Sequence, residues 1–126
     1  MSVDVPQHIE YWRNGSDEDI AAARDLLKSR HTRHGLFFAH LALEKIIKAH
    51  VVKTSKKPAP KIHNLVWLIS NSGLELDEDR LDFLGKFNIF QLECRYPDDN
   101  VVIDKKIARM KLSEAEKMQQ WLKNQL

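Results

Sequence analysis

The sequence predicts an all-α fold, an up-and-down bundle of four long helices and one short helix, on three observations. Apolar residues recur three or four positions apart in several long segments, which places them on one face of a helix. No segment alternates apolar and polar residues for long enough to form a strand. Turn-forming residues separate the periodic segments. With 126 residues, 43% of them hydrophobic, we expect one domain, residues 1–126, with a modest core.

The first periodic segment covers residues 8–30. It runs through Asn14-Gly15, a pair that commonly breaks helices, and the next residue, Ser16, is a candidate N-cap followed by three acids. A continuous helix and a helix that starts at Ser16 both fit the sequence, and either predicts a helix from about Ser16 to Arg30. We interpret the basic segment that follows as a solvated turn rather than a phosphate contact.

The central helix is predicted from Arg33 to Val52, because its apolar residues wrap almost all the way around it and so mark a helix enclosed by others. An unpaired charge in such a position is costly, so each polar side chain must face a neighbouring element, a partner chain or water. Four polar residues lie in this apolar surround: His40, Glu44, Lys45 and Lys48.

After the central helix, residues 53–61 carry four lysines and two prolines, which predicts a loop. We favour a solvated loop over a phosphate-binding edge. A short third helix is predicted over residues 62–72, with Gly73 as its C-terminal stop.

Asp77 is the expected N-cap of a fourth helix, whose apolar residues extend to Leu92. They cover a wider face than one packing partner needs, so part of it is a candidate dimer surface. Pro97 ends this segment, and a last amphipathic helix is predicted from Asp104, with Ser113 as a possible second start.

Composition excludes several classes of protein. A net charge of +2 is too small to indicate nucleic-acid binding through bulk charge, so any RNA site must be local. The one cysteine, Cys94, cannot form an internal disulfide, and the scattered histidines show no zinc-type spacing. No run of 18 apolar residues is present, and the N-terminal residues are not those of a signal peptide. We expect a soluble, cytoplasmic protein that does not associate with membranes.

Three groups of residues remain as candidates for chemistry, since the common nucleotide-binding, zinc-protease and hydrolase motifs are absent. His40 and Glu44, four residues apart, can share a helix face, but two ligands are too few for a metal site and a structural hydrogen bond is the favoured role. His63 with its neighbour Asn64 opens the third helix, where capping is the default role.

The third group is the segment from Cys94 to Asp98. Arg95 offers a planar fork suited to phosphate, and Tyr96 offers a ring suited to stacking on a base. A structural ion pair between Arg95 and a carboxylate explains the same residues equally well.

Taken in order, these groups resemble the HEPN family (higher eukaryotes and prokaryotes nucleotide-binding). The resemblance rests on the run from His40 to Ala49, on Pro60 with His63-Asn64-Leu65, and on Arg95-Tyr96-Pro97-Asp98, spread over nearly the whole chain. It implies a helical bundle that pairs two-fold and is often encoded beside a small nucleotidyltransferase, in a toxin-antitoxin-like or nucleotide-handling pair.

The resemblance also implies a test for enzymatic activity. Many members are metal-independent ribonucleases with an Arg followed four to six residues later by His. Arg95 matches the Arg, but Asn100, Val101 and Val102 stand where the His is expected. An amide or an alkyl group cannot transfer a proton as imidazole does, so the acid-base half of such a mechanism is missing and we favour a non-catalytic protein. We also expect no cofactor.

Three hypotheses follow. The first is a non-catalytic HEPN homodimer that binds a nucleotide, RNA or a small nucleotidyltransferase; the second is a metal-independent endoribonuclease with an altered motif; the third is a dimerising scaffold without a ligand. The candidate binding residues are Arg95, Tyr96, Asp98, Lys45, Lys48, Glu44, His40 and His63.

Overall fold

The computed structural model describes residues 3–92 and 104–126. Over these two ranges the chain forms five α-helices and one 3-10 helix, with no strand. The elements in chain order are α1 (Val5–Lys28), α2 (Thr32–Ser55), α3 (Leu65–Ser70), α4 (Glu78–Phe87), η1 (Asn88–Leu92) and α5 (Lys105–Asn124). The expected all-α bundle is confirmed, although the predicted long fourth helix divides into α4, of 10 residues, and η1, of 5.

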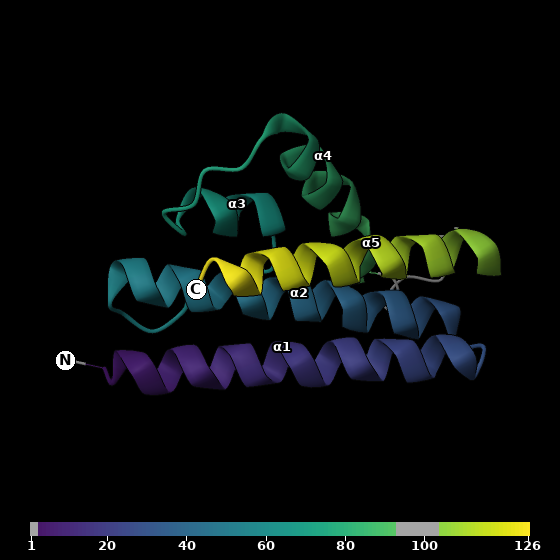
Figure 1. Cartoon of the computed structure of the whole chain (residues 1–126), viewed down its shortest axis with the longest axis horizontal. Coiled ribbons are helices and arrows are strands. Elements are labelled where there is room, and N and C mark those ends of the chain that lie inside the picture. The colour runs from purple at the N-terminus through teal and green to yellow at the C-terminus, as the bar shows by residue number, and fades with distance from the viewer. Residues whose placement is uncertain (1–2, 93–103) are drawn as a thin grey trace.

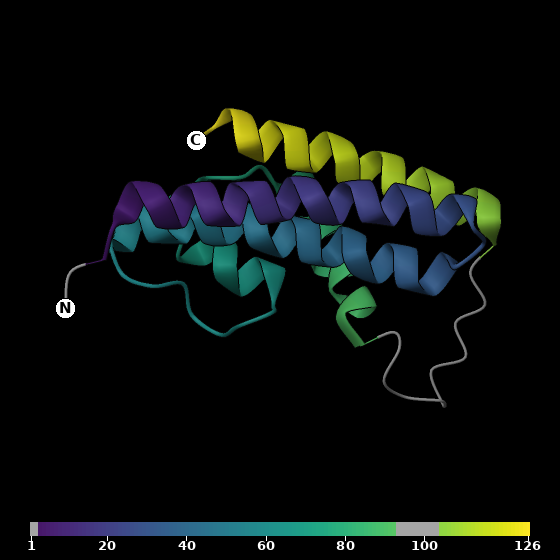
Figure 2. The same cartoon turned by 90° about the horizontal axis from the view of Figure 1, so that it is seen from below.

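The three longest helices form the body of the bundle. α1 and α2 lie side by side and antiparallel, and α5 packs against both (Figures 1 and 2). α3 and the inclined α4 lie on the side of α2 that faces away from α1 (Figure 1). α2 is therefore the element around which the other layers are arranged.

α1 is one continuous helix that passes through Asn14-Gly15 without a break. Asp4 caps it by accepting a hydrogen bond from the Gln7 amide at 3.1 Å. Ser16 is not an N-cap: it is fully buried, and its hydroxyl donates to the Ala42 carbonyl of α2 at 2.6 Å. Packing against α2 overrides the local breaker signal.

α2 confirms the predicted central helix and extends it to Ser55.

The packing of α1 on α2 is close because the contact residues are small. A methyl group added to Gly35 would clash with Leu27 Cδ1 and would lie 3.2 Å from the Ala23 carbonyl oxygen. The buried residues of α2 are Gly35, Leu36, Ala39, His40, Ala42, Leu43, Glu44, Ile46, Ile47, Lys48, Ala49, His50, Val51 and Val52.

The remaining helix ends follow the sequence signals more closely. Asn64, Asp77 and Asp104 each cap the helix that follows by accepting a backbone amide hydrogen bond. The third helix starts at Leu65, later than predicted, because Asn64 is its cap. Ser113 does not restart the last helix, which is continuous.

The core lies between α1, α2 and α5 and continues beneath α4 and η1. Of the wide apolar face predicted before Pro97, Leu84, Phe87 and Phe90 are buried, while Ile89 is 52% exposed. Among the described helices, none is both long and apolar enough to cross a membrane.

Candidate functional site

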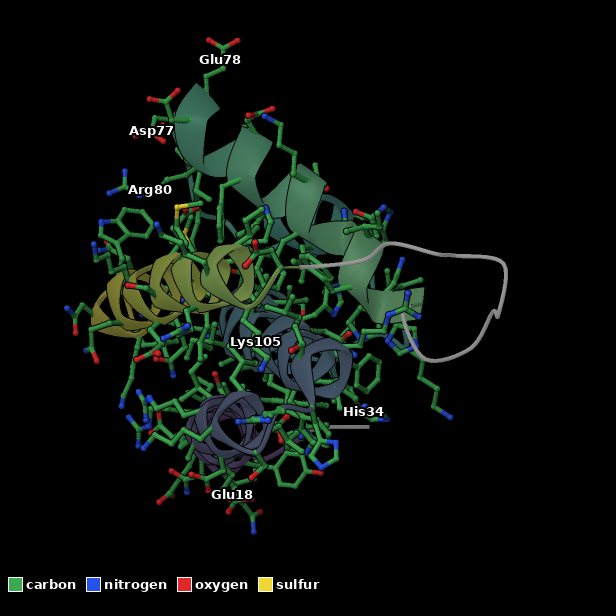
Figure 3. The ribbon with its side chains drawn as sticks, turned by 90° about the vertical axis from the view of Figure 1, so that its right-hand side faces the viewer. Glu18, His34, Asp77, Glu78, Arg80 and Lys105 are labelled. Carbon is green, nitrogen blue, oxygen red and sulfur yellow. The ribbon has the colours of Figure 1, made fainter. Side chains whose placement is uncertain are left out.

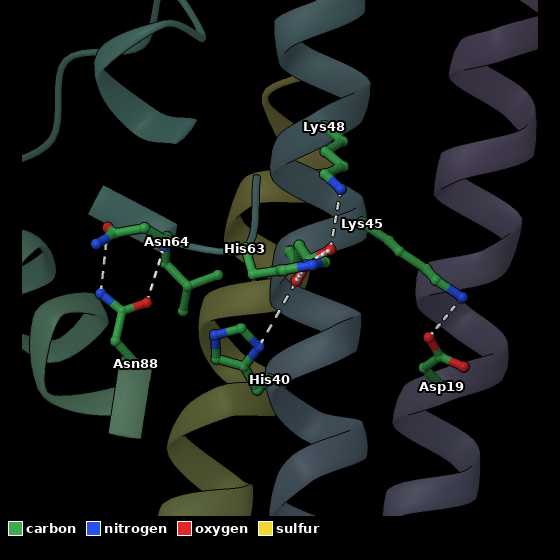
Figure 4. A network of polar contacts seen from close by, with 9 residues as sticks. Asp19, His40, Lys45, Lys48, His63, Asn64 and Asn88 are labelled. Carbon is green, nitrogen blue, oxygen red and sulfur yellow. Dashed lines mark hydrogen bonds and ion pairs between the residues drawn. The ribbon is translucent and has the colours of Figure 1, made fainter. Parts of the chain in front are cut away.

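Two residues of α2, His40 and Lys48, and His63 from the loop before α3 form a cluster around the buried carboxylate of Glu44. Figure 4 labels these three residues. Lys48 Nζ donates to Glu44 Oε2 at 3.0 Å from one helical turn further on. His63 Nδ1 lies 3.1 Å from both carboxylate oxygens. Glu44 and Lys48 are sealed from solvent, whereas 57% of the His63 side chain is exposed. Of the described residues that contact Glu44, His63 is the one that reaches the surface.

His40 sits one turn before Glu44 and is 1% exposed. Burial lowers the pKa of His40 to about 4, and it outweighs the nearby Glu44 carboxylate and Asn88 amide, which act in the opposite direction. At neutral pH the ring is uncharged, so its 3.8 Å approach to Glu44 Oε1 is not an ion pair. Among the described residues, neither ring nitrogen meets the geometry of a hydrogen bond. His40 is therefore a buried, uncharged side chain that packs beside Glu44.

Two asparagines fix the chain next to His63 (Figure 4). Asn64 Oδ1 accepts from the Trp67 amide at 3.0 Å and caps α3. Asn88 Oδ1 accepts from the Leu65 amide at 2.8 Å, and its side-chain amide donates to Asn64 Oδ1 at 3.3 Å. His63 therefore stands at a fixed helix start, which Glu44 ties to α2 and Asn88 ties to η1.

The two lysines predicted to bind a ligand are both paired within the fold. Lys45 Nζ lies 2.8 Å from Asp19 of α1, and its side chain is 29% exposed. Lys48 is buried, and its ammonium also lies 5.3 Å from the centre of the Trp12 ring. Lys48 thus has a structural place in the cluster, while Lys45 lies at its edge.

A face with exposed aromatic surface adjoins this cluster. Tyr11 is 68% exposed, and its ring meets that of Trp12 edge-on at 5.1 Å. A hollow of about 460 Å³ lies on one side of Tyr11, bounded by Trp12 and by Pro58 and Ala59 of the loop that leads to His63. A smaller hollow of about 190 Å³ also includes Tyr11 and is bounded by Lys45.

Sequence reasoning missed Tyr11 and Asp19 as members of this region. A signal for Tyr11 was available, because it stands beside the apolar stripe of α1 and an aromatic side chain off the stripe tends to be exposed. The pairing of Asp19 with Lys45 depends on how α1 and α2 align, which no local pattern reveals.

Three predicted site residues, Arg95, Tyr96 and Asp98, lie outside the described residues. Of the others, the structure brings His40, Glu44, Lys48 and His63 together and directs Lys45 toward α1 instead. In the described ranges no group of three or more His, Cys, Asp or Glu side chains is arranged to hold a metal ion.

The orientation of His63 decides which of its ring nitrogens can contact a ligand. A carboxylate at Nδ1 selects the tautomer in which Nδ1 carries the hydrogen, so Nε2 is left for an external group. Nε2 can then accept a proton or, when protonated, donate a hydrogen bond to an anion.

Comparisons with known proteins agree with this architecture. No curated protein matches the chain. A solved structure, TT1696 from Thermus thermophilus, superposes with a TM-score of 0.81 over 94% of this chain and 98% of that one, at 17% sequence identity, which shows a shared fold. The model of the HEPN domain matches residues 9–125. This match spans nearly the whole sequence, and the chain therefore belongs to the HEPN domain family.

Proposed function

We propose that this chain is a non-catalytic HEPN module that binds a nucleotide or a short stretch of RNA on the face formed by α1, α2 and the loop before α3. The observation that carries the proposal is the exposed imidazole of His63, held at 3.1 Å by the buried carboxylate of Glu44. A buried acid that fixes an exposed base positions one nitrogen for a ligand outside the fold.

The surroundings of His63 suit a phosphate. Lys57 and Lys61 precede it in the loop and are exposed, and within the described part of the chain neither forms an ion pair. A cation on a flexible side chain attracts phosphate without demanding one geometry. The loop therefore carries positive charge within six residues of a fixed imidazole.

The adjoining aromatic face suits a base. The ring of Tyr11 is largely exposed between two hollows, and Trp12 and Pro58 wall the larger of them. Stacking on an aromatic side chain contributes about 1–3 kcal/mol per base and does not depend on sequence. A nucleotide on this face would place its base near Tyr11 and its phosphate near His63.

The sequence supports binding rather than cleavage. The family's ribonuclease motif pairs an Arg with a later His, and after Arg95 this chain has Asn100, Val101 and Val102 in the His positions. Arg95, Tyr96 and Asp98 stay in the proposal as further ligand contacts.

A titration with ATP, GTP and a short single-stranded RNA, followed by fluorescence anisotropy or calorimetry, tests the proposal. His63→Ala and Arg95→Ala should each weaken binding about tenfold, the loss of one charge-assisted contact. The matched control is His34→Ala, because His34 is also exposed but lies at the start of α2, outside the Glu44 cluster (Figure 3). Absence of binding to all three ligands, or equal loss in the control, would contradict the proposal.

A metal-independent ribonuclease is the second candidate, and the same pairing favours it. An imidazole oriented by a carboxylate is the arrangement of a general base, so His63 could supply the acid-base group that the motif lacks. Purified protein would then cleave RNA in the presence of EDTA, and both His63→Ala and Arg95→Ala would abolish cleavage. Cleavage that survives both substitutions would come from a contaminant.

Association is the remaining part of the proposal. Three exposed apolar side chains, Val66, Trp67 and Ile89, lie on α3 and η1, and Val66 packs beside Gly85 of α4. We infer that this surface pairs two copies of the chain. Sedimentation should give a dimer that Ile89→Asp dissociates and that Ile107→Asp, an exposed apolar position on α5, does not.

A small nucleotidyltransferase is the proposed protein partner, in a toxin-antitoxin-like pair. Co-expression with a neighbouring gene of that type and co-purification of the two proteins would support this assignment. A dimer that binds neither a nucleotide, RNA nor such a partner would leave the scaffold hypothesis in place.

A further inference from the structure

A second concave site lies toward the other end of α1 from Tyr11, between the last turns of α1 and the first half of α5. It is a cavity of about 520 Å³ whose apolar surface comes from Leu27, Ala108 and Leu112. Figure 3 looks onto this end of the bundle, with Lys105 at the start of α5. The cavity shares no residue with the Glu44 cluster or with the two hollows beside Tyr11.

The rim of this cavity is strongly basic. Five cations and one acid line it, and the acid, Glu116, is paired with Arg24 at 3.0 Å. The other four cations are exposed and, within residues 3–92 and 104–126, form no ion pair: Lys28, Arg30, Lys105 and Arg109. Four unpaired like charges around one cavity repel one another, and a bound polyanion would relieve that repulsion.

Arg30 of the basic rim stands at a position where the backbone favours glycine. It is the second residue after the end of α1 and adopts φ +67°, a left-handed conformation that glycine adopts at lower cost. A glycine there would make the turn easier to form. The arginine side chain is therefore not required by the backbone.

We infer that this cavity binds an organic polyphosphate, a small molecule that carries two or more phosphate groups on an apolar or aromatic body. The volume suits one such molecule and lies in the range of ordinary ligand sites. Four unpaired cations match several negative charges, and the apolar floor matches a body that a bare inorganic anion lacks. The site is separate from the face proposed above, and the inference does not depend on that proposal.

Calorimetric titration with three probes tests both halves of the inference. ATP carries charge and an aromatic body, tripolyphosphate carries charge alone, and adenosine carries the body alone. We expect ATP to bind at least about tenfold more tightly than either of the other two, because only ATP uses both the rim and the floor. Equal affinity for ATP and tripolyphosphate would show that the apolar floor does not contribute to binding, and this result would overturn the inference.

Variants locate the ATP site. Arg30→Gly combined with Lys105→Ala should weaken ATP binding by about tenfold or more, since two charge-assisted contacts are lost. The control, Lys86→Ala with Lys117→Ala, changes net charge equally at exposed positions outside the cavity. Arg30→Gly alone removes a rim charge while easing the turn, so it keeps the test valid if the double variant folds poorly.

The two sites can fail separately. ATP binding that is lost in His63→Ala and unchanged in the cavity variant would overturn this inference and leave the function proposed for the His63 face intact. No binding of ATP to the wild-type chain would also overturn it. In the cavity variant we expect ATP to keep only the binding that depends on His63, while RNA binding is unchanged.

Discussion

His63 and Glu44 are 19 residues apart in the sequence, yet His63 Nδ1 lies 3.1 Å from both oxygens of the Glu44 carboxylate. One partner is buried in α2 and the other is largely exposed just before α3. The contact therefore ties the loop to the central helix. It also lets a buried carboxylate fix the orientation of an exposed imidazole ring.

The Glu44–Lys48 pair should be costly to break from one side. Glu44→Leu leaves the Lys48 ammonium buried without its partner, and we expect the free energy of unfolding to fall by about 3–5 kcal/mol. Urea denaturation followed by circular dichroism measures this. The double variant Glu44→Leu with Lys48→Met should recover most of the loss, because no buried charge remains; a double variant as unstable as the single one would contradict the account.

The stability of the protein should fall as the pH drops from about 6.5 to about 4. The pKa of His40 is lowered by burial from 6.5 to about 4, so in this window the unfolded chain takes up a proton that the folded chain does not. The full effect is on the order of 3 kcal/mol for His40, and His50, whose pKa is also lowered by burial, adds in the same direction.

Denaturation curves measured at several pH values check this dependence. His40→Leu should flatten it, and His34→Leu, which removes an exposed imidazole, should leave it unchanged. Parallel pH profiles for wild type and His40→Leu would show that His40 is not buried in its neutral form.

Two glycines should respond oppositely to the same substitution. Gly35→Ala places a methyl group against Leu27 and the α1 backbone, which should cost about 1–3 kcal/mol. Gly85→Ala, on α4, meets only Val66 at 3.7 Å and should stabilise the helix by about 0.5–1 kcal/mol. Thermal melts of both variants test the close approach of α1 to α2, and equal shifts would count against it.

Two serines that share a sequence signature should also differ. Ser16→Ala removes a buried hydroxyl that bonds the Ala42 carbonyl and accepts from Gln119, at an expected cost of about 1–3 kcal/mol. Ser113 is exposed in the middle of α5, so Ser113→Ala should be neutral or slightly stabilising. A larger loss at Ser113 would instead indicate a helix that restarts there.

Local chemistry accounts for what the sequence predicted well. The apolar surround of α2, the cap Asp77 and the start of the last helix near Asp104 were predictable, because periodicity and capping act within a few residues. The passage of α1 through Asn14-Gly15 was not decided by the sequence. The bond from Ser16 to Ala42 that helps hold it spans 26 residues.

In the candidate site, too, the sequence identified the polar residues but not the features that depend on how distant segments pack. His40, Glu44, Lys48 and His63 were identified as polar residues in an apolar setting, and their common location follows from the fold. What could not be predicted was which of them is sealed, since that depends on the covering loop and α1. The sequence showed the basic turn after α1, which we interpreted as solvated, but not the cavity beside it, because Lys105 and Arg109 come from the opposite end of the chain.

Nitrogen-15 NMR of the imidazole rings tests the central claim most directly. In the free protein, the His63 nitrogen that faces Glu44, Nδ1, should carry a hydrogen. Addition of the RNA or nucleotide that binds should shift the Nε2 resonance of His63 and leave those of buried His40 and His50 in place. A His63 Nε2 resonance that does not move when a ligand is bound would contradict the claim that this imidazole faces the ligand.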